Sequence, residues 1–528
     1  MVKKYPLYAH PRLKTIDELL RYGVEKYGDM PLFRYAVRKD EVTVTYRAFY
    51  EEVQALGVWL QAQGLRGRHV AVYGENSYEW IAVHLAVTCS GGVIVPLDKE
   101  LTVPQVQELL LDSECAACFY SETYADIAQE AQASIPQTAF FSLKQFTEWT
   151  AAGKKLPAVQ AEITEKSLAS IVYTSGTTGK SKGVMLTHGN FMACMHGACS
   201  NIWVGGDTLL VLPLHHTFGL VANIYCVMMY GKAVYINRSL KRIAGDFKAA
   251  QPQMVFAVPL VLDMLYKNIW AAARKQGKEK ALRLLVKISD ALLICGIDLR
   301  RKLFKTVLDS LGGRLEFIVS GGAPLSEQRV RDFRSFGITV LNGYGITECG
   351  PIVSANRNRH IVPGSVGLPL CCNEVKMSDE GEVLVRGENV MVGYYHNEEE
   401  NCKAFVDGWF RTGDLGRIDE HGALHITGRL KNLIILSNGE NIAAESLEER
   451  VLALPYVREA VAYGQDEMIV AEVFLDEEVS DARERIHADI QKINATLPLV
   501  KNIGRVIVRE EEFPKTSTRK IKRNYGGQ

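Results

Sequence analysis

Residues 173–183 read Tyr-Thr-Ser-Gly-Thr-Thr-Gly-Lys-Ser-Lys-Gly, and they continue directly from the apolar run Ser-Ile-Val at 170–172. Glycines let backbone N–H groups approach a phosphate closely, hydroxyl groups add donors, and the two lysines add positive charge. This density of such residues just after a buried strand predicts a phosphate-binding loop and not a surface turn. The predicted nucleotide-binding residues of this loop are Thr174, Ser175, Gly176, Thr177, Thr178, Gly179 and Lys180.

Two common nucleotide motifs do not fit this part of the chain. A P-loop ending at the Gly-Lys-Ser of 179–181 requires glycine at position 174, where the sequence has Thr174. A dinucleotide fingerprint starting at Gly343 requires a third glycine at the position of Glu348. The loop therefore predicts phosphate binding of another kind.

The segments on both sides of the loop alternate between strand and helix signals. Short apolar runs end in Gly-, Pro- or Ser-rich loops, and stretches such as 46–63, which Gly64 ends, have helical periodicity. The apolar runs lie at 69–74, 93–98, 117–121, 171–176, 208–214, 233–237, 254–259, 315–322 and 338–345. The alternation predicts an α/β fold with mostly parallel sheets covered by helices. Ligands of such sheets bind at the carboxyl ends of the strands.

The chain is longer than one core allows, since single cores stop growing at about 250–300 residues. Near residue 380 the pattern changes to short strands broken by turns, which predicts a β-rich subdomain. After Arg429 the charge density rises and a compact α+β pattern follows. We therefore expect a large N-terminal domain over 1–429 and a small mobile C-terminal domain over 430–528, with a hinge near 428–432.

Composition excludes several classes of partner. With 61 basic and 61 acidic residues the net charge is zero, which argues against nucleic acid and against anionic lipid as the main partner. No run reaches the about 20 apolar residues that a membrane span needs, so we expect no transmembrane segment, and peripheral membrane contact stays open. The basic start of the chain lacks the apolar segment of a secretory signal. Cys115 and Cys118 are expected on a buried strand, and eleven scattered cysteines favour a reducing, cytoplasmic setting.

The loop and five further motifs resemble the adenylate-forming (AMP-binding) superfamily, and among its members the fatty acyl-CoA synthetases. The further motifs are SGGAPL (320–325), NGYGITECGP (342–351), GWFRTGDLG (408–416), GRLKNLIILSNGENI (428–442) and PKTSTRKIKR (514–523). The resemblance implies an enzyme that activates a carboxylic acid with ATP. It would form acyl-AMP, release pyrophosphate and pass the acyl group to coenzyme A, with Mg²⁺ as a further cofactor.

The resemblance also implies roles for residues of the large domain. Gly322, Ala323 and Pro324 would lie along the adenine, and Asn342, Gly343, Tyr344 and Gly345 would form the turn beside it, with Tyr344 stacked on the ring. Thr347 would contact the α-phosphate. Glu348, together with Thr178, would hold magnesium, and Asp414 would accept both ribose hydroxyls.

Near and beyond the predicted hinge, four residues match functional positions of the family. Arg429 would reach ribose or phosphate, and Lys431 would lie at the pivot of a domain rotation. Gly439 belongs to a loop expected to enter the site for thioester formation. Lys520 matches the catalytic lysine, although Arg519 precedes it where the family usually has glycine.

The kind of carboxylic acid that serves as substrate is predicted from the segment 213–231, which contains no Asp or Glu. A substrate ammonium buried there would have no counter-charge, so an amino acid is disfavoured and a fatty acid favoured. His216 matches a family histidine near the acyl pocket, with a core role as its alternative. An acyl carrier protein as acceptor, or an aromatic acid as substrate, stays open. A non-catalytic adenylate-binding protein is the remaining alternative, against which Glu348, Asp414 and Lys520 argue.

Overall fold

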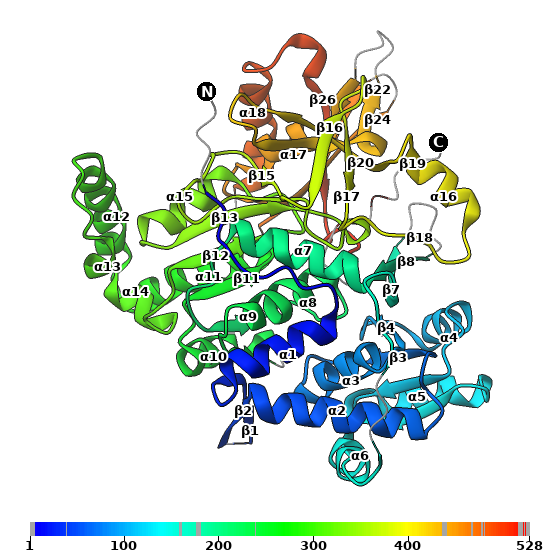
Figure 1. Cartoon of the computed structure of the whole chain (residues 1–528). Helices are drawn as coiled ribbons and strands as arrows, with labels where there is room; N and C mark the ends of the chain where they lie inside the picture. The colour runs from blue at the N-terminus through cyan, green and yellow to red at the C-terminus, as the bar shows by residue number, and fades with distance from the viewer. Residues whose placement is uncertain are drawn as a thin grey trace. The chain divides into compact units, whose positions relative to one another are not determined.

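The computed structural model of the chain describes residues 6–38, 40–157, 161–175, 181–237, 239–435, 441–465, 468–476, 479, 481–515, 521 and 523. The chain divides into two compact units (Figure 1). The first comprises residues 1–374 and 385–410, and the second comprises 375–384 and 411–528. A hinge at 428–432 and domains of 1–429 and 430–528 stay predictions.

The first unit contains a seven-stranded sheet in the order β18-β8-β7-β4-β3-β5-β6. Its strands are β3 (His69–Tyr73), β4 (Val93–Leu97), β5 (Ala117–Tyr120), β6 (Ala139–Ser142), β7 (Leu168–Ser175), β8 (Ser181–Thr187) and β18 (Gly393–Tyr394). Strands β7, β4, β3, β5 and β6 are parallel, whereas β8 and β18 add antiparallel edges. The parallel arrangement predicted from the apolar runs is therefore confirmed.

Helices cover this sheet (Figure 1). They are α2 (Tyr46–Ala62), α3 (Tyr78–Cys89), α4 (Val103–Asp112), α5 (Ala125–Ser134) and α6 (Phe146–Gly153). The helix predicted over 46–63 is α2, and Thr45 caps it by accepting a hydrogen bond from Ala48 N at 3.2 Å. Cys118 is buried on β5, as predicted. Cys115 is also buried but lies two residues before that strand, so its predicted place on the strand is wrong. Burial raises the pKa of the Cys115 thiol to about 12.

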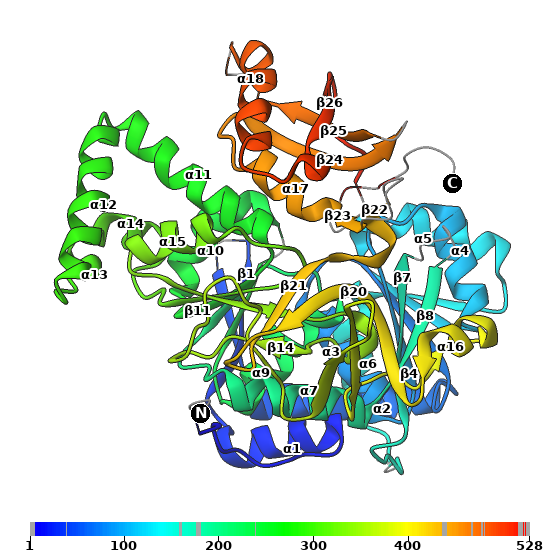
Figure 2. The same cartoon turned by 90° about the horizontal axis from the view of Figure 1, so that it is seen from above.

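A nine-stranded sheet completes the first unit, in the order β15-β14-β13-β12-β11-β9-β10-β1-β2. Its strands are β1 (Pro31–Val37), β2 (Asp40–Thr45), β9 (Thr208–Leu210), β10 (Val234–Ile236), β11 (Met254–Ala257), β12 (Phe317–Ser320), β13 (Thr339–Tyr344), β14 (Ser354–Ala355) and β15 (Leu368–Pro369). The six from β13 to β1 are parallel. Its helices, seen in Figure 2, include α1 (Ile16–Tyr27), α7 (His188–Asn201), α10 (Ile243–Ala250), α11 (Pro259–Lys275), α12 (Glu279–Ile294), α13 (Arg300–Leu303), α14 (Lys305–Ser310) and α15 (Glu327–Ser335).

Short strands begin where the sequence pattern changes near residue 380. They form a five-stranded sheet in the order β16-β17-β20-β19, and β21 pairs with the later part of β20, at 414–418. Its strands are β16 (Asn373–Met377), β17 (Glu382–Gly387), β19 (Phe405–Val406), β20 (Trp409–Ile418) and β21 (Leu424–Arg429), and helix α16 (Glu398–Ala404) precedes β19. The predicted β-rich subdomain is thus present. Strands β16, β17 and β20 each continue from one unit into the other.

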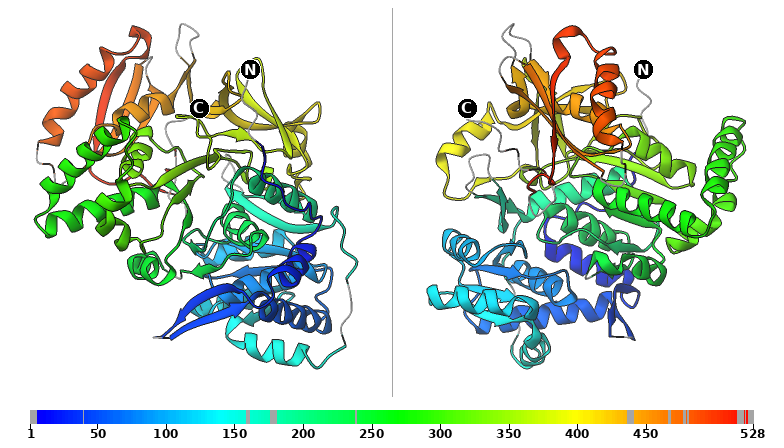
Figure 3. Two further views of the ribbon diagram at one scale, coloured as in Figure 1. Left: turned by 60° about the vertical axis from the view of Figure 1, so that its left-hand side comes forward. Right: turned by 180° about the vertical axis from the view of Figure 1, so that it is seen from behind.

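The rest of the second unit is a small α+β fold (Figure 3). A three-stranded sheet, β24-β25-β26, accompanies the two-stranded pair β22-β23. Its elements are β22 (Leu433–Ile435), β23 (Asn441–Ala443), α17 (Ala444–Leu452), β24 (Val457–Gln465), β25 (Met468–Leu475), α18 (Ala482–Asn494) and β26 (Ile503–Arg509). Buried Leu447, Val473 and Ile486 belong to its own core. Across the described part of the chain, no helix has the length and apolarity that crossing a bilayer requires.

Candidate active site

The carboxyl ends of strands from both large sheets meet inside the first unit. The Asn76 side chain, just after β3, donates to Leu212 O at 2.8 Å and accepts from Leu214 N at 3.0 Å. Leu212 and Leu214 follow β9 of the other sheet. These hydrogen bonds join the carboxyl-end edges of the two sheets, where α/β proteins bind their ligands.

The predicted phosphate loop is the tip of the β7–β8 hairpin. Thr174 pairs with Lys182, and Ser175 pairs with Ser181, so the hairpin stays in register up to the loop. Thr174 is half-buried at the carboxyl end of β7. The predictions for Gly176, Thr177, Thr178, Gly179 and Lys180 fall outside the described residues and stay predictions.

Lys182, at the base of the hairpin, belongs to a network that the sequence did not predict. Its ammonium pairs with Glu400 and lies 5.1 Å from the ring centre of Tyr394. The Tyr394 hydroxyl donates to Oε1 of Glu348 at 2.9 Å. Burial, together with the Glu348 charge, raises the pKa of Tyr394, and the hydrogen bond from Lys182 lowers the pKa of Glu400. The network therefore favours a protonated Tyr394, which can donate to the predicted metal ligand.

The predicted adenine segment joins β12 to α15. Gly322 has a positive φ of 82°, and Ala323 and Pro324 follow it towards the helix. Ser320 at the end of β12 lies in register with Asn342 of β13. Ser320 Oγ and Asn342 Oδ1 are buried without a hydrogen-bond partner among the described residues. Buried polar atoms are normally paired, so this edge suits a ligand that carries donors, such as the adenine amino group.

The turn that carries Tyr344 and Glu348 is tightly constrained. A Cβ atom on Gly345 would lie 1.9 Å from Pro351 O, so only glycine fits there. The 3-10 turn η5 (Thr347–Cys349) follows, and the Glu348 carbonyl accepts a hydrogen bond from Met391 N at 2.8 Å. Gly343 and Tyr344 pair with β14. Backbone packing thus fixes Tyr344, Thr347 and Glu348 in one rigid turn.

Glu348 is the carboxylate predicted to hold magnesium. The Tyr394 hydroxyl donates to Oε1, and no hydrogen bond to Oε2 is found among the described residues. Magnesium in nucleotide sites typically takes one or two protein carboxylates and completes its shell with phosphate oxygens and water. Among the described residues no cluster of three or more His, Cys, Asp or Glu could hold a metal ion by itself.

His216 belongs to the segment 213–231, which is predicted to bind the acid. It precedes α8 (Thr217–Leu220), and its ring contacts that of His215 with Nε2 atoms 3.1 Å apart. His215 lies 3.6 Å from Asp98, and burial lowers its pKa to about 3, which keeps it neutral. Phe218 packs against Gly321, where an added Cβ would lie 3.3 Å from its ring. The acid segment therefore touches the adenine segment.

The rest of this segment forms a short π-helix, η3 (Val221–Tyr225), and helix α9 (Cys226–Met229), both fully buried. Asn223 is the only residue of the segment 213–231 with a side-chain amide, and this amide donates a hydrogen bond to Gly219 O at 3.3 Å. Tyr225 contacts His84 at 3.4 Å, and burial lowers the pKa of His84 to about 3. No acidic side chain appears between 213 and 231, so the segment itself offers an ammonium no counter-charge, and Asp98 beside His215 is the acidic side chain found next to it here.

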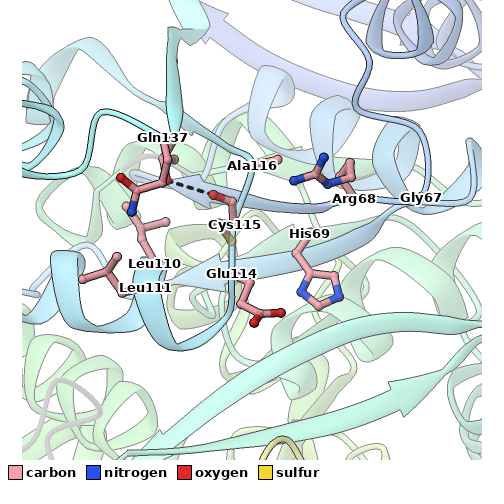
Figure 4. A pocket seen from close by; sticks show the side chains of 10 residues that line it. Gly67, Arg68, His69, Leu110, Leu111, Glu114, Cys115, Ala116 and Gln137 are labelled. Atoms are coloured by element: carbon pink, nitrogen blue, oxygen red, sulfur yellow. Dashed lines mark hydrogen bonds between the residues drawn. The ribbon is translucent and has the colours of Figure 1, made fainter.

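A hollow of about 470 Å³ lies elsewhere (Figure 4). Arg68, His69, Glu114 and Gln137 line it, at the amino ends of β3, β5 and β6. Because the ligand edge of a parallel sheet is the carboxyl one, this hollow belongs to the opposite edge. It is not part of the candidate active site.

Asp414 and Arg429 face each other in the second unit. They are register partners on β20 and β21, and Arg429 Nε lies 2.9 Å from Asp414 Oδ1. Asp414 is buried, and its backbone N–H donates to Thr412 Oγ1 at 3.1 Å. Gly413 before it donates to Glu382 at 2.9 Å. The turn thus holds a carboxylate, the acceptor-only group that a ribose diol requires.

Lys431 lies in the 3-10 turn η6 (Leu430–Asn432), directly after β21. Burial, followed by the charges of Arg429 and Arg523, lowers the pKa of Lys431. Asn432 ties the turn to α17 by donating to Glu445 at 2.6 Å. Gly439 and Lys520 lie outside the described residues, so their roles stay predictions.

Comparison with known proteins agrees with this arrangement. Residues 20–395 match the family "AMP-binding enzyme", and residues 431–525 match "AMP-binding enzyme C-terminal domain". The chain is 32% identical over 452 residues to long-chain-fatty-acid–CoA ligase FadD15 of Mycobacterium bovis, covering 80% of this chain and 75% of that protein. It is 28% identical over 531 residues to long chain acyl-CoA synthetase 7, peroxisomal, of Arabidopsis thaliana, covering 91% and 75%.

Among solved structures, the anthranilate CoA ligase AuaEII in complex with anthranoyl-AMP is similar with a TM-score of 0.80. The alignment covers 97% of this chain and 96% of that one, at 20% identity. At this identity the likeness shows the fold alone.

Proposed function

Because the chain belongs to the AMP-binding enzyme family, we propose that it is an ATP-dependent fatty acid–CoA ligase. The acid would attack the α-phosphorus of ATP to form acyl-AMP and release pyrophosphate. The thiol of coenzyme A would then attack the acyl carbon and release AMP. The single observation that carries this proposal is that the turn 342–348, with Tyr344, Thr347 and Glu348, lies near the segment 213–231, which has no Asp or Glu: Gly343 and Phe218 both lie against Gly321.

Positioning and charge stabilisation would supply most of the first step, as in phosphoryl transfer generally. Tyr344 would stack on adenine. The side-chain oxygen of Asn342 would accept a hydrogen bond from the adenine amino group. Thr347 would hold the α-phosphate, and Asp414 would bind the ribose diol. The loop 174–180 and Lys520 would supply N–H groups, hydroxyls and positive charge around the negative charge that develops during attack.

We further propose that Glu348 holds Mg²⁺, with Thr178 as a second ligand. A bound magnesium would neutralise part of the phosphate charge. Tyr394 supports this role because it engages one carboxylate oxygen and so orients the other.

A fatty acid is the proposed substrate because the segment 213–231 is buried, mostly apolar and without Asp or Glu. Burying an alkyl tail contributes about 0.8 kcal/mol per CH₂. One methylene changes specificity by roughly 1–3 kcal/mol at most, so we expect a broad preference among medium to long chains. The two relatives compared above carry long-chain names, which supports this reading.

The acceptor and the compartment also belong to the proposal. Coenzyme A is the proposed acceptor, with an acyl carrier protein as the alternative. The cysteines are free thiols, which agrees with a reducing compartment such as the cytoplasm.

Acid-dependent AMP formation across short, medium, long-chain and aryl acids, with coenzyme A or a carrier protein, tests the proposal. We expect the highest kcat/KM for a medium or long alkyl acid with coenzyme A. Lys520→Ala should lower adenylation roughly 10²–10³-fold while sparing thioester formation from supplied acyl-AMP. Faster turnover of benzoates than of alkyl acids would contradict the substrate, and equal loss in both half-reactions would contradict the role of Lys520.

A further inference from the structure

Two adjacent histidines face an aspartate where the two large sheets present their carboxyl ends. His215 and His216 follow β9 in the chain, and Asp98 comes directly after β4. The Nε2 atoms of the two histidines lie 3.1 Å apart, and Nε2 of His215 also lies 3.6 Å from Oδ1 of Asp98. His215 is buried, whereas His216 is half-buried and precedes α8. One ring nitrogen of His215 therefore lies between a carboxylate and the second histidine.

The short distance between the two Nε2 atoms determines which nitrogen carries each proton. Burial, followed by the Lys99 charge, lowers the pKa of His215 to about 3, so this ring is neutral and has a single N–H. Of two ring nitrogens that face each other, one must donate and the other accept. If His215 accepted, its lone pair would also face the Asp98 carboxylate, and the two would repel each other. His215 therefore donates from Nε2, and His216 accepts at its own Nε2.

A neutral histidine that accepts at Nε2 carries its proton on Nδ1. His216 belongs to the part of the segment 213–231 that touches the adenine segment, because Phe218 packs against Gly321. The segment 213–231 contains no Lys or Arg, so it offers a substrate carboxylate no cation. A carboxylate that leaves water then needs N–H or O–H donors. The Nδ1–H of His216 is such a donor.

We propose that Asp98 and His215 are positioning residues that hold His216 in its neutral form with the proton on Nδ1, and that this N–H binds the carboxylate of the acid substrate. The binding of the carboxylate rests on the proposed function, whereas the place of the proton does not. Asp98 acts through His215 and does not touch the substrate. A carboxylate fixes the tautomer of a histidine in the same way in hydrolase triads, where its loss leaves the wrong nitrogen protonated.

The first test locates the proton directly, by ¹⁵N NMR of the full chain labelled at histidine. The ring nitrogens of a neutral histidine differ in chemical shift according to which one carries the proton, and His216→Gln assigns the signals of His216 by their loss. We expect the wild-type His216 to be protonated on Nδ1. In His215→Phe, which removes the donor, its proton should move to Nε2, the position that an unconstrained histidine prefers. A wild-type His216 protonated on Nε2, or an unchanged proton position in His215→Phe, would overturn the proposal.

The second test is acid-dependent ATP–pyrophosphate exchange with octanoate. His215→Phe should raise the KM for octanoate roughly 10–100-fold, as expected when one hydrogen bond to a charged group is lost. His215→Gln keeps a side-chain N–H near the position of Nε2 and should retain the wild-type KM. Asp98→Ala should raise the KM about two-fold, because the two proton arrangements become similar in energy and half of the molecules present the N–H. In the His215→Phe background, Asp98→Ala should add nothing, since Asp98 acts through His215.

ATP binding without acid is the readout that damage to the fold would change, and it should be the same in all variants. Glu100→Ala is the matched control, since Glu100 is exposed two residues from Asp98 and its carboxylate pairs with Lys99 at 3.5 Å. Its KM for octanoate should equal that of the wild type.

Equal losses in His215→Phe and His215→Gln, or loss of ATP binding in parallel with the rise in KM, would overturn the positioning role. Absence of acid-dependent exchange in the wild type would contradict the ligase proposal. The proton positions seen by NMR would still decide whether Asp98 and His215 hold His216 in the form with the proton on Nδ1.

Discussion

The Tyr394 hydroxyl donates a hydrogen bond to one oxygen of Glu348. Neighbouring Tyr395 donates to Glu114 at 2.9 Å, away from the turn that carries Glu348. Two adjacent tyrosines thus make similar bonds to two carboxylates, only one of which belongs to the candidate site. Comparing variants of Tyr394 and Tyr395 can therefore distinguish an effect on the orientation of a metal ligand from a general effect on stability.

Tyr394→Phe should raise the Mg²⁺ concentration for half-maximal adenylation roughly ten-fold, because residues that orient metal ligands are typically worth 10–100-fold. Mg²⁺-dependent ATP binding, measured without acid, provides a readout separate from turnover. Tyr395→Phe is the control and should leave both curves in place. Identical curves for Tyr394→Phe and the wild type would remove Tyr394 from the site.

Asp414 also has a counterpart within its own sheet. Asp419 forms a comparable pair with His425 at 2.9 Å, on the turn that joins β20 to β21. Asp414→Asn should weaken ATP–pyrophosphate exchange roughly 10–100-fold, because a hydrogen bond to a charged group contributes about 1.5–3 kcal/mol. Asp419→Asn should exchange normally. Equal losses in the two variants would indicate that Asp414 only supports the turn.

Sequence reasoning found residues that stand in compact motifs and missed those that act across the fold. Tyr344, Thr347 and Glu348 are close in sequence, and a turn places them together without long-range information. Tyr394 and Glu400 reach the same site from β18 and α16, through contacts spanning 46 and 218 residues. The only sequence feature that pointed towards them was Lys182, the second lysine of the loop. The spacing of residues in the sequence does not predict that Lys182 pairs with Glu400.

Among the elements, apolar runs predicted the parallel strands well, because strands buried on both faces read as continuous apolar segments. The segment 213–231 is a harder case. Its composition predicts burial, but the change from α8 to a short π-helix depends on how it packs. A Cβ on Gly219 would lie 2.3 Å from Pro213 O, a constraint that composition does not contain.

The turn η6 allows a direct test of the predicted pivot. Proline fixes φ near −65° and removes an N–H group, so Lys431→Pro should restrict rotation there. We expect adenylation to persist and thioester formation from supplied acyl-AMP to fall. Lys431→Ala, which removes the charge and keeps the backbone free, is the control. If the proline variant carries out both half-reactions at wild-type rates, the pivot lies at another position.

Over the whole chain, buried neutral histidines link stability to pH. Burial lowers the pKa of His84 and His215 to about 3 and that of His188 to about 4, against about 6.5 in an unfolded chain. Between those values the unfolded chain binds more protons than the folded one. The free energy of unfolding should therefore fall as pH falls from about 6.5 towards about 4.

His84→Gln removes one of these titrating groups while keeping a polar side chain opposite Tyr225. Denaturant unfolding at a series of pH values should show a shallower loss of stability for this variant between pH 6.5 and about 4. His421→Gln is the control, since His421 is 58% exposed, and its slope should match the wild type. An unchanged slope in His84→Gln would mean that other groups dominate the acid response.

The path of the chain through the five-stranded sheet has a practical consequence for dissecting and recombining this enzyme. Strand β20 begins at Trp409 and β21 ends at Arg429, and both belong to the sheet that contains β17. A gene cut at 410 would remove β21 and most of β20 from the N-terminal fragment, leaving β17 with an unpaired edge prone to aggregation. A cut after Arg429 would leave the sheet whole and release a fragment with its own core. Chimeras that exchange C-terminal segments between relatives should therefore be joined at 429/430.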